Sequence, residues 1–263
     1  MAATDLALWD IAGKAAGMPV YRMLGPVRER MPAYSMSGWY YEKDDDLSRY
    51  QQAIEASFEE GFRAVKIKVG RGTIDDDVSR IELALKLAGK PRKVMVDANQ
   101  VFNRNEALRR GRVYQQMGCF WYEEPLAPHD KDGYAELAAE LDIRIATGEN
   151  EYTKYAFADL VARRAADVVQ PDNRRAGGLT EWMEIGAIAD GFGIELASHG
   201  GGPTNMHMLL AMPNAIFMET GSLKGDSSHV EALRMVDGEV LAPESIGLGS
   251  ELRADYIRKY KVG

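Results

Sequence analysis

The chain has 263 residues, of which 46% are hydrophobic, and it carries a net charge of −8 with a pI near 5.2. This length and apolar content suffice for one large core, and the acidic balance argues against binding to nucleic acid or to an anionic membrane surface. The single cysteine, Cys119, excludes an internal disulfide and agrees with a reducing, cytoplasmic setting, and neither a membrane span nor a signal peptide is indicated.

The first expected element is a helix over residues 4–24, which begins at Thr4 and is ended by Gly25-Pro26. Strand and helix patterns then alternate up to about residue 221. The eight expected strands cover Met31–Met36, Ala64–Val69, Val94–Asp97, Phe120–Glu123, Ile143–Thr147, Asp167–Gln170, Ile194–Ser198 and Ile216–Glu219. The helices expected between them cover Asp46–Glu60, Asp75–Leu87, Asn105–Met117, Tyr134–Leu141, Tyr155–Ala165, Leu179–Ala189 and Asn205–Ala211.

This alternation predicts an α/β fold in which eight parallel strands close into a (β/α)7β barrel, a modified TIM barrel, over residues 27–224. From about Gly225 the pattern changes. Asp237-Gly238 between short apolar runs indicates a hairpin, and Arg253–Lys261 a last helix. Active sites of such barrels lie at the carboxyl ends of the strands, so polar residues at those ends are the candidates for function.

Three acidic residues stand at the ends of successive expected strands, each 26 residues after the one before: Asp97, Glu123 and Glu149. Any one of them alone would more often be a helix N-cap or part of a loop ion pair. Three at equivalent strand ends would meet at one mouth of the barrel, where carboxylates repel one another unless a cation lies among them. An all-oxygen ligand set suits Mg²⁺, so the spacing predicts a magnesium site.

Two lysines lie on the second expected strand, Ala64–Val69. Strand side chains alternate between the two faces, and the apolar residues at every other position must face the surrounding helices. Lys66 and Lys68 then point into the barrel near its mouth. The alternative is an exposed strand with two solvated lysines, which the β-branched residues beside them disfavour.

Three more polar residues follow the last three strands. Asp172 and His199 stand at neighbouring strand ends, so a carboxylate on one ring nitrogen could fix the tautomer and leave the other nitrogen as a base or an acid. Glu219 ends the eighth strand at the mouth and, taken alone, is as compatible with a functional role there as with a structural contact to the backbone or to a lysine. No chemistry is assigned to the remaining histidines, His129, His207 and His229.

Together these residues resemble the enolase superfamily, and within it the mandelate racemase subgroup. The matching positions, in order and in spacing, are Lys66-x-Lys68, the Asp97/Glu123/Glu149 triad, the Asp172–His199 dyad and Glu219. The opening segment, Thr4–Gly17, is also similar to the one that leads into the family's barrel, so the resemblance covers essentially the whole chain.

The resemblance further implies an N-terminal α+β capping domain that closes over the barrel mouth. On this interpretation residues 1–26 are a remnant of that domain and its lead-in helix, and residues 27–224 are the barrel. Residues 225–263 would be a tail that packs on the missing cap and is left without a partner. The chain is then either a fragment of a longer protein or a shortened form.

The chemistry implied by the resemblance is abstraction of the proton α to a carboxylate. Mg²⁺ on the acidic triad would stabilise the enediolate that forms, and Lys66 would add positive charge. Glu219, if protonated, would donate a hydrogen bond to a substrate carboxylate oxygen, and Asn99 would contact a substrate hydroxyl. Lys68 would be the general base.

The role of His199 decides between two reactions. If it protonates a leaving hydroxyl on the β-carbon, a sugar acid is dehydrated to a 2-keto-3-deoxy acid, which is the expected reaction. If it returns a proton to the α-carbon, the enzyme is a racemase or epimerase of a 2-hydroxy acid.

A different class of function is an inactive barrel that binds an anionic ligand, and a further alternative is another metal-dependent reaction such as aldol cleavage. The complete acid–base set argues against a role in binding alone. The expected partner is a small carboxylate, a sugar acid, with no nucleic acid and no membrane. The resemblance also implies a symmetric homo-oligomer.

Overall fold

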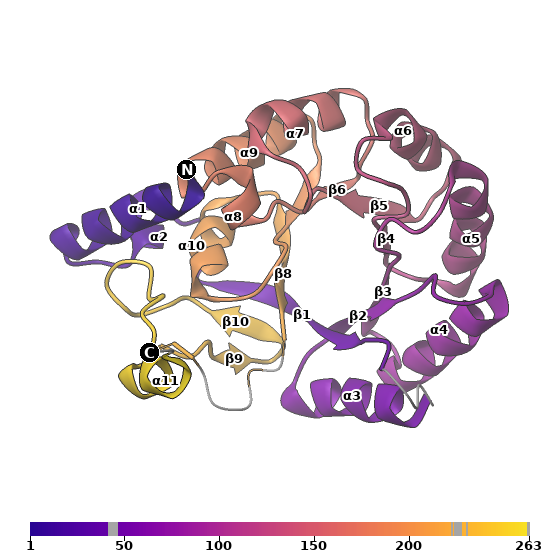
Figure 1. Cartoon of the computed structure of the whole chain (residues 1–263), viewed down its shortest axis with the longest axis horizontal. Helices are drawn as coiled ribbons and strands as arrows, with labels where there is room; N and C mark the ends of the chain where they lie inside the picture. The colour runs from indigo at the N-terminus through magenta and orange to yellow at the C-terminus, as the bar shows by residue number, and fades with distance from the viewer. Residues whose placement is uncertain (42–46, 222, 224–227, 230, 262–263) are drawn as a thin grey trace.

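Eight parallel strands close into a barrel, which Figure 1 shows end-on in the computed structural model; the structure describes residues 1–41, 47–221, 223, 228–229 and 231–261. Their order is β2-β3-β4-β5-β6-β7-β8-β1, and β1 pairs back to β2. The strands are β1 (Arg30–Gly38), β2 (Ala64–Lys68), β3 (Lys93–Asp97), β4 (Trp121–Glu123), β5 (Arg144–Thr147), β6 (Val168–Val169), β7 (Glu195–Ala197) and β8 (Ala215–Thr220). The expected (β/α)7β barrel is confirmed.

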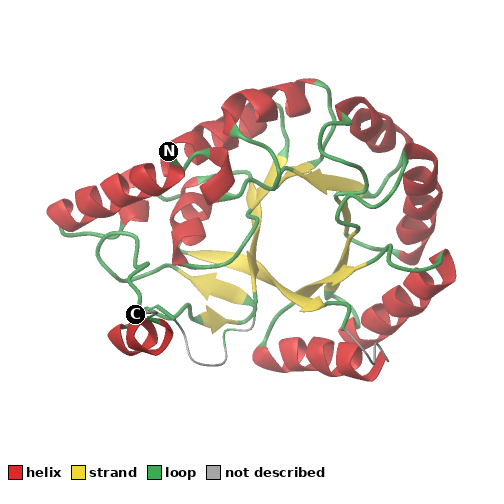
Figure 2. Cartoon of the chain, viewed as in Figure 1, coloured by secondary structure: helices red, strands yellow, loops and turns green. Residues whose placement is uncertain are grey.

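Helices cover the outside of the barrel (Figure 2). They are α3 (Leu47–Glu60), α4 (Ile74–Ala88), α5 (Arg104–Met117), α6 (Lys131–Glu140), α7 (Thr153–Ala162), α8 (Asn173–Ala176), α9 (Leu179–Gly191) and α10 (Pro203–Ala211). The single turn α8 was not expected, because four residues are too few to show a helical period. The expected helix start at Asp46 and the boundary at Gly225 lie outside the described residues. Within the described ranges, every helix is too short or too polar to cross a bilayer.

The expected single helix over residues 4–24 is instead two helices, α1 (Ala2–Ala16) and α2 (Val20–Leu24). The break has a local cause: Gly17 adopts a left-handed conformation with φ of 67°, and Pro19 has no N–H to continue a helix. The apolar side chains of α1 are only partly buried: Trp9 packs against the core, whereas Ile11 is 61% exposed. Trp9 Nε1 also donates to Thr180 Oγ1 at 2.9 Å, which fastens α1 to α9.

The tail does have partners in its described part, so the prediction that it lacks them is wrong. The expected hairpin forms as β9 (Met235–Val236) and β10 (Glu239–Leu241), and β10 pairs antiparallel with the first residues of β1. Those residues of β1 precede the ones that pair with β8, so they offer a free strand edge. Further on, the carbonyl of Gly247 accepts from the Val20 N–H at 3.0 Å. The last helix, α11 (Ala254–Tyr260), lies close to its expected position.

A ring of eight side chains fills the barrel interior, with one residue from each strand. The members are Tyr34, Ala64, Met95, Trp121, Ala146, Val168, Ala197 and Phe217. Three aromatic rings occupy most of the space and pack edge to face, with centroids 5.1 Å apart for Tyr34 and Trp121. Alanines on three of the other strands leave room for these rings. The interior is therefore a packed floor, and the mouth above it is the level at which the candidate site residues face inward.

The packing of α1 against the tail gives a test of this arrangement. A Cβ added at Gly13 would lie 2.8 Å from Gly247 Cα, so Gly13→Ala should force the tail and α1 apart and lower the free energy of unfolding by about 1–3 kcal/mol. Gly191→Ala is the control, because nothing lies within 4 Å of its added Cβ and helix propensity favours alanine by up to about 1 kcal/mol. Urea unfolding measures both, and equal stability of the two variants would contradict the packing.

Candidate active site

The polar residues at the mouth stand one layer above the apolar ring. On five strands they follow the ring residue by two positions, which is the period that keeps a side chain on the inner face of a strand. These residues are Lys66, Asp97, Glu123, His199 and Glu219. The same offset on β6 gives Gln170, which the sequence analysis did not single out.

Glu149 and Asp172 reach the mouth in other ways. On β5 the offset position is Gly148, whose φ of 132° turns the backbone before Glu149; a Cβ there would lie 2.8 Å from the Phe157 ring. Asp172 is the N-cap of α8, and its Oδ1 accepts from the Arg174 N–H at 2.7 Å. Both side chains lie beside His199, so the structure brings all the expected mouth carboxylates to one end of the barrel.

Lys66 is the centre of a buried charge cluster. It is 4% exposed, and its Nζ donates to Glu123 and, at 2.5 Å, to Glu219 Oε2, with Asp97 Oδ2 3.5 Å away. The aromatic ring of Tyr34 lies below, 5.4 Å from the same nitrogen. Burial favours the neutral amine, but the surrounding carboxylates outweigh it and raise the pKa of Lys66. A cation is thus held at the middle of the acidic residues.

Two carboxylates beside Lys66 differ in pKa. Burial raises the pKa of Glu123 to about 8, helped by the charges of Asp97 and Glu219. Burial also acts on Glu219, but the Lys66 charge and the Tyr34 hydroxyl, at 2.7 Å, lower its pKa overall. The lowered pKa favours the ionised form of Glu219, whereas the donor role implied by the resemblance requires its protonated form. As a carboxylate it accepts hydrogen bonds, including one from the Gly200 N–H at 2.7 Å.

Lys68 lies next to the Lys66 cluster, nearer to solvent. Its Nζ is 2.5 Å from Asp97 Oδ2 and 4.9 Å from the ring centroid of Trp39. Its main-chain carbonyl accepts from Nε of the buried Arg80 at 3.3 Å, and a second guanidinium nitrogen donates to the Trp39 carbonyl at 3.0 Å. The sequence prediction that both lysines point inward agrees with these contacts.

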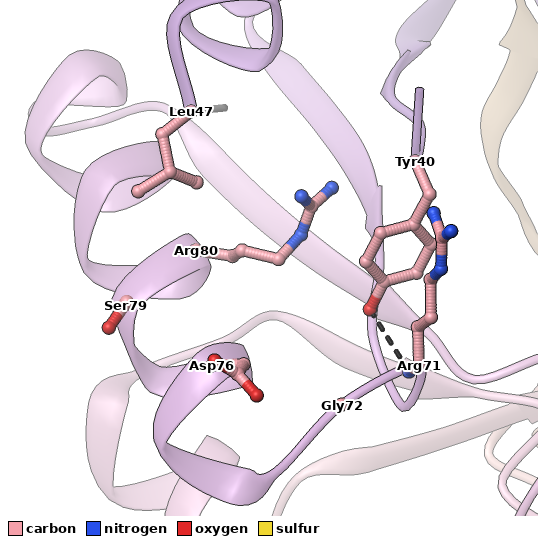
Figure 3. A pocket seen from close by; sticks show the side chains of 7 residues that line it. All are labelled: Tyr40, Leu47, Arg71, Gly72, Asp76, Ser79 and Arg80. Carbon is pink, nitrogen blue, oxygen red and sulfur yellow. Dashed lines mark hydrogen bonds between the residues drawn. The ribbon is translucent and has the colours of Figure 1, made fainter. Parts of the chain in front are cut away.

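Arg80 also borders a cavity of about 350 Å³ between α3 and α4, shown in Figure 3. Its guanidinium lies 4.2 Å from the ring centroid of Tyr40, which stands between it and Arg71 in that view. None of the expected catalytic residues lines this cavity. Arg80 thus holds the main chain at Lys68 and Trp39 through the hydrogen bonds described above.

His199 and Asp172 form the expected dyad. Nδ1 of His199 lies 2.9 Å from Asp172 Oδ2, and Nε2 lies 3.2 Å from Glu149 Oε2 and 4.0 Å from Glu219 Oε1. Burial favours the neutral imidazole, but the hydrogen bond that His199 donates to Asp172 and the charges of Glu219 and Glu149 raise the pKa of His199 overall. The pKa of Asp172 is lowered: burial opposes ionisation, and the bonds from His199 and Arg174 outweigh it. The dyad therefore favours an imidazolium.

The acidic triad supplies oxygen donors suited to a magnesium ion, but in this structure they do not form a complete coordination shell. Asp97 and Glu123 are register partners on adjacent strands, and Glu149 follows on the next strand. Within the described part of the chain, no three histidine, cysteine or acidic side chains lie in an arrangement that could hold a metal ion. Lys66 and Lys68 contact the oxygens of Asp97 and Glu123 instead. All-oxygen donors at adjacent strand ends fit Mg²⁺, provided that these side chains move apart from the lysines.

Two further hydrogen bonds orient Glu123, and neither was predicted from the sequence. Trp121 Nε1 and Gln170 Nε2 both donate to Glu123 Oε2, at 3.0 and 2.9 Å, so its other oxygen faces Lys66. The period-two offset from Val168 could have pointed to Gln170. Asn99, expected to contact substrate, is exposed just after β3, with φ of 44° and its N–H bonded to Asp97 Oδ1 at 2.9 Å.

Of the other residues, Cys119 is buried and free, and His207 is buried with Nδ1 accepting from the Tyr21 N–H at 3.0 Å and Nε2 3.1 Å from the Leu248 carbonyl. Burial lowers the pKa of His207 to about 4. These contacts agree with assigning it a structural role only.

The family model described as enolase C-terminal domain-like matches residues 49–256. The arabinonate dehydratase of Saccharolobus solfataricus is 34% identical over 265 residues, which cover 98% of this chain and 70% of that protein. L-Talarate dehydratase from a Polaromonas species, solved with Mg and L-glucarate, has a TM-score of 0.90 at 33% identity over 98% of this chain and 71% of that one. A racemase from Streptomyces coelicolor with bound magnesium has a TM-score of 0.92 at 30% identity, with the same coverage.

The dyad gives a prediction for the protein without metal. Asp172→Asn replaces the anion that stabilises the His199 imidazolium with a neutral amide, so the pKa of His199 should fall. Glu149 and Glu219 remain and should keep part of the elevation. NMR titration of the histidine side chains measures this, and His207 serves as an internal control because it stays neutral above pH 5 in both proteins. An unchanged His199 pKa would contradict the assignment.

Proposed function

The chain belongs to the enolase C-terminal domain-like family, and we propose that it is a Mg²⁺-dependent lyase that dehydrates a sugar acid to a 2-keto-3-deoxy acid. The observation that carries this proposal is the position of an amine and an imidazole at the two ends of one row of carboxylates. Lys68 contacts Asp97, and His199 contacts Glu149. A substrate bound over that row would have a base on one side and an acid on the other.

In the proposed reaction Lys68 takes the proton from the α-carbon, and the electron pair of that bond forms the carbon–carbon double bond. The β-hydroxyl leaves with its bonding electrons and receives a proton from His199, so that water and an enol result. The enol then tautomerises to the 2-keto acid. The raised pKa of His199 supports its role as the proton donor.

Asp97, Glu123 and Glu149 are proposed to hold the metal, which would supply Lewis-acid stabilisation of the charge that develops on the substrate carboxylate. Lys66 adds a fixed positive charge that is buried and needs no rearrangement during the reaction. Glu219 is proposed to accept rather than donate a hydrogen bond. Asn99, exposed at the mouth, is proposed to contact a substrate hydroxyl.

Racemisation or epimerisation is the second candidate, because the same pair, Lys68 and His199, would exchange protons on opposite sides of the α-carbon. The structural similarity to a racemase supports it. Only dehydration creates a new ketone, so a semicarbazide assay on a panel of sugar acids separates the two reactions. Complete inactivity on that panel, together with no proton exchange, would favour a barrel that only binds anions.

Two substitutions separate the proposed roles. Lys68→Ala should lower the rate of α-proton exchange into D₂O by at least about 10²–10⁴-fold, since no base remains. His199→Asn should lower 2-keto acid formation by a similar factor while exchange continues. Exchange is measured by NMR and product by the semicarbazide assay, and circular dichroism checks the fold. Full product formation in either variant would remove that residue from the mechanism.

The pKa of Glu123 predicts how metal binding depends on pH. In the protein without metal, burial raises this pKa to about 8, so below pH 8 the carboxyl holds a proton that Mg²⁺ must displace. Apparent Mg²⁺ affinity should therefore increase as pH rises from 6 to 8, with proton release at the lower pH. Calorimetry in buffers of different ionisation enthalpy measures both quantities. Glu123→Gln should abolish the proton release and weaken binding, and pH-independent binding by the wild type would contradict the assignment.

A further inference from the structure

A second row of polar side chains runs just outside the acidic triad. Its members are Gln100, Glu124, Asn150 and Arg175. They follow four successive strands, three of them in loops and Arg175 in α8, at separations of 24, 26 and 25 residues, which is the pitch of the strand–helix units. Two of them directly follow a member of the triad in the sequence.

Glu124 is the centre of this row. It is 1% exposed, and its two oxygens accept hydrogen bonds from different loops: Gln100 Nε2 at 3.0 Å and Asn150 Nδ2 at 2.7 Å. Asn150 in turn accepts from Arg175 at 2.8 Å, and its amide nitrogen is 3.4 Å from Glu149 Oε1. One carboxylate therefore connects the loops that carry all three members of the triad.

The backbone of these loops is shaped for the same connection. Asn99, Gln100 and Glu124 have φ values of 44°, 69° and 40°. These values lie in the left-handed region, which residues other than glycine seldom adopt. The Gln100 N–H also donates to the Glu124 carbonyl at 2.7 Å. Strain of this kind persists only where the surroundings impose it, and it is concentrated at functional sites.

Burial of a carboxylate is costly unless its oxygens are bonded, and here both are bonded by neutral amides. Glu124 lies beside Glu123 in sequence, yet it faces the loops rather than the Lys66 cluster. Its contacts are those of a group that sets the spacing of its neighbours, as expected of residues that orient metal ligands.

We propose that Glu124, with Gln100 and Asn150, is a positioning group that fixes the distances between the three loops carrying Asp97, Glu123 and Glu149, and so sets the affinity for Mg²⁺. This inference rests on the metal site of the proposed function. It assigns Glu124 no contact with metal or substrate.

The test exchanges donor and acceptor along one hydrogen bond. In Gln100→Glu two carboxylates would face each other and the bond is lost, whereas in Glu124→Gln the Gln100 amide can turn its oxygen toward the new N–H, so that a bond remains. In the double variant the new amide donates to the new carboxylate and still accepts from Asn150. We expect Gln100→Glu to bind Mg²⁺ about 10–100-fold more weakly, and the double variant to recover most of that loss.

Calorimetric titration with MgCl₂ measures the affinities, and thermal unfolding without metal checks that each variant folds. Gln52→Glu is the matched control, because it makes the same chemical change at an exposed residue of α3. It should bind as the wild type does. Asn150→Ala, which removes the second donor to Glu124 and the acceptor of Arg175, is the further variant if Gln100→Glu fails to fold, and it should also weaken binding.

The outcomes separate this inference from the proposed function. Wild-type affinity in Gln100→Glu or, if that variant does not fold, in Asn150→Ala, would overturn the positioning role and leave the metal site standing. A double variant that binds no more tightly than Gln100→Glu would overturn it as well, since it would show no exchange of donor and acceptor. A wild-type protein that binds no Mg²⁺ would overturn both.

Discussion

The mouth of this barrel depends on compensation of buried charge. Lys66, Asp97, Glu123 and Glu219 are each less than 5% exposed, so water cannot screen them and each ionised group needs a partner of opposite sign. Lys66 supplies that partner in the arrangement described, and the uneven pKa shifts of Glu123 and Glu219 follow from it. Removal of the lysine would leave three buried carboxylates facing one another. The same requirement for positive charge makes the site suitable for a divalent cation.

The barrel concentrates these charges because side chains along each strand alternate between its inner and outer faces with a period of two residues. A tight floor of eight interior side chains, dominated by Tyr34, Trp121 and Phe217, closes the space below. The next inward position on each strand then lies at the rim, where polar groups converge without being lost in an apolar interior. Site and core are thus successive layers of the same strands, and this explains how an acidic cluster is tolerated above a floor that contains no charge.

Much of this could be read from the sequence, because the alternation of strands and helices and the spacing of 26 residues are periodic signals. The barrel, the inward direction of Lys66 and Lys68 and the pairing of Asp172 with His199 were accessible in that way, whereas the family followed from the resemblance of the site residues. What escaped prediction depends on single backbone angles and on three-dimensional neighbours. The helix break at Gly17 needs one left-handed residue, and the lowered pKa of Glu219 depends on Lys66 and on Tyr34, which is 185 residues away in the sequence. Glu124 and Glu123 differ only in the direction in which their side chains point. Two adjacent acidic residues in a sequence do not show that direction.

The contacts of the lysines also link metal binding to the base. Lys68 is 2.5 Å from the Asp97 oxygen that also lies 3.5 Å from Lys66. Asp97 would have to give up its contacts with both lysines before that oxygen could bind a metal. If Mg²⁺ binds the triad, it competes with these ammonium groups for the same oxygens. Lys68 would then be released from Asp97 and could turn toward a substrate, while Lys66 retains Glu219 as a partner. The cation and the base are in this way parts of one electrostatic balance, in which filling the metal site would free Lys68 for its proposed role.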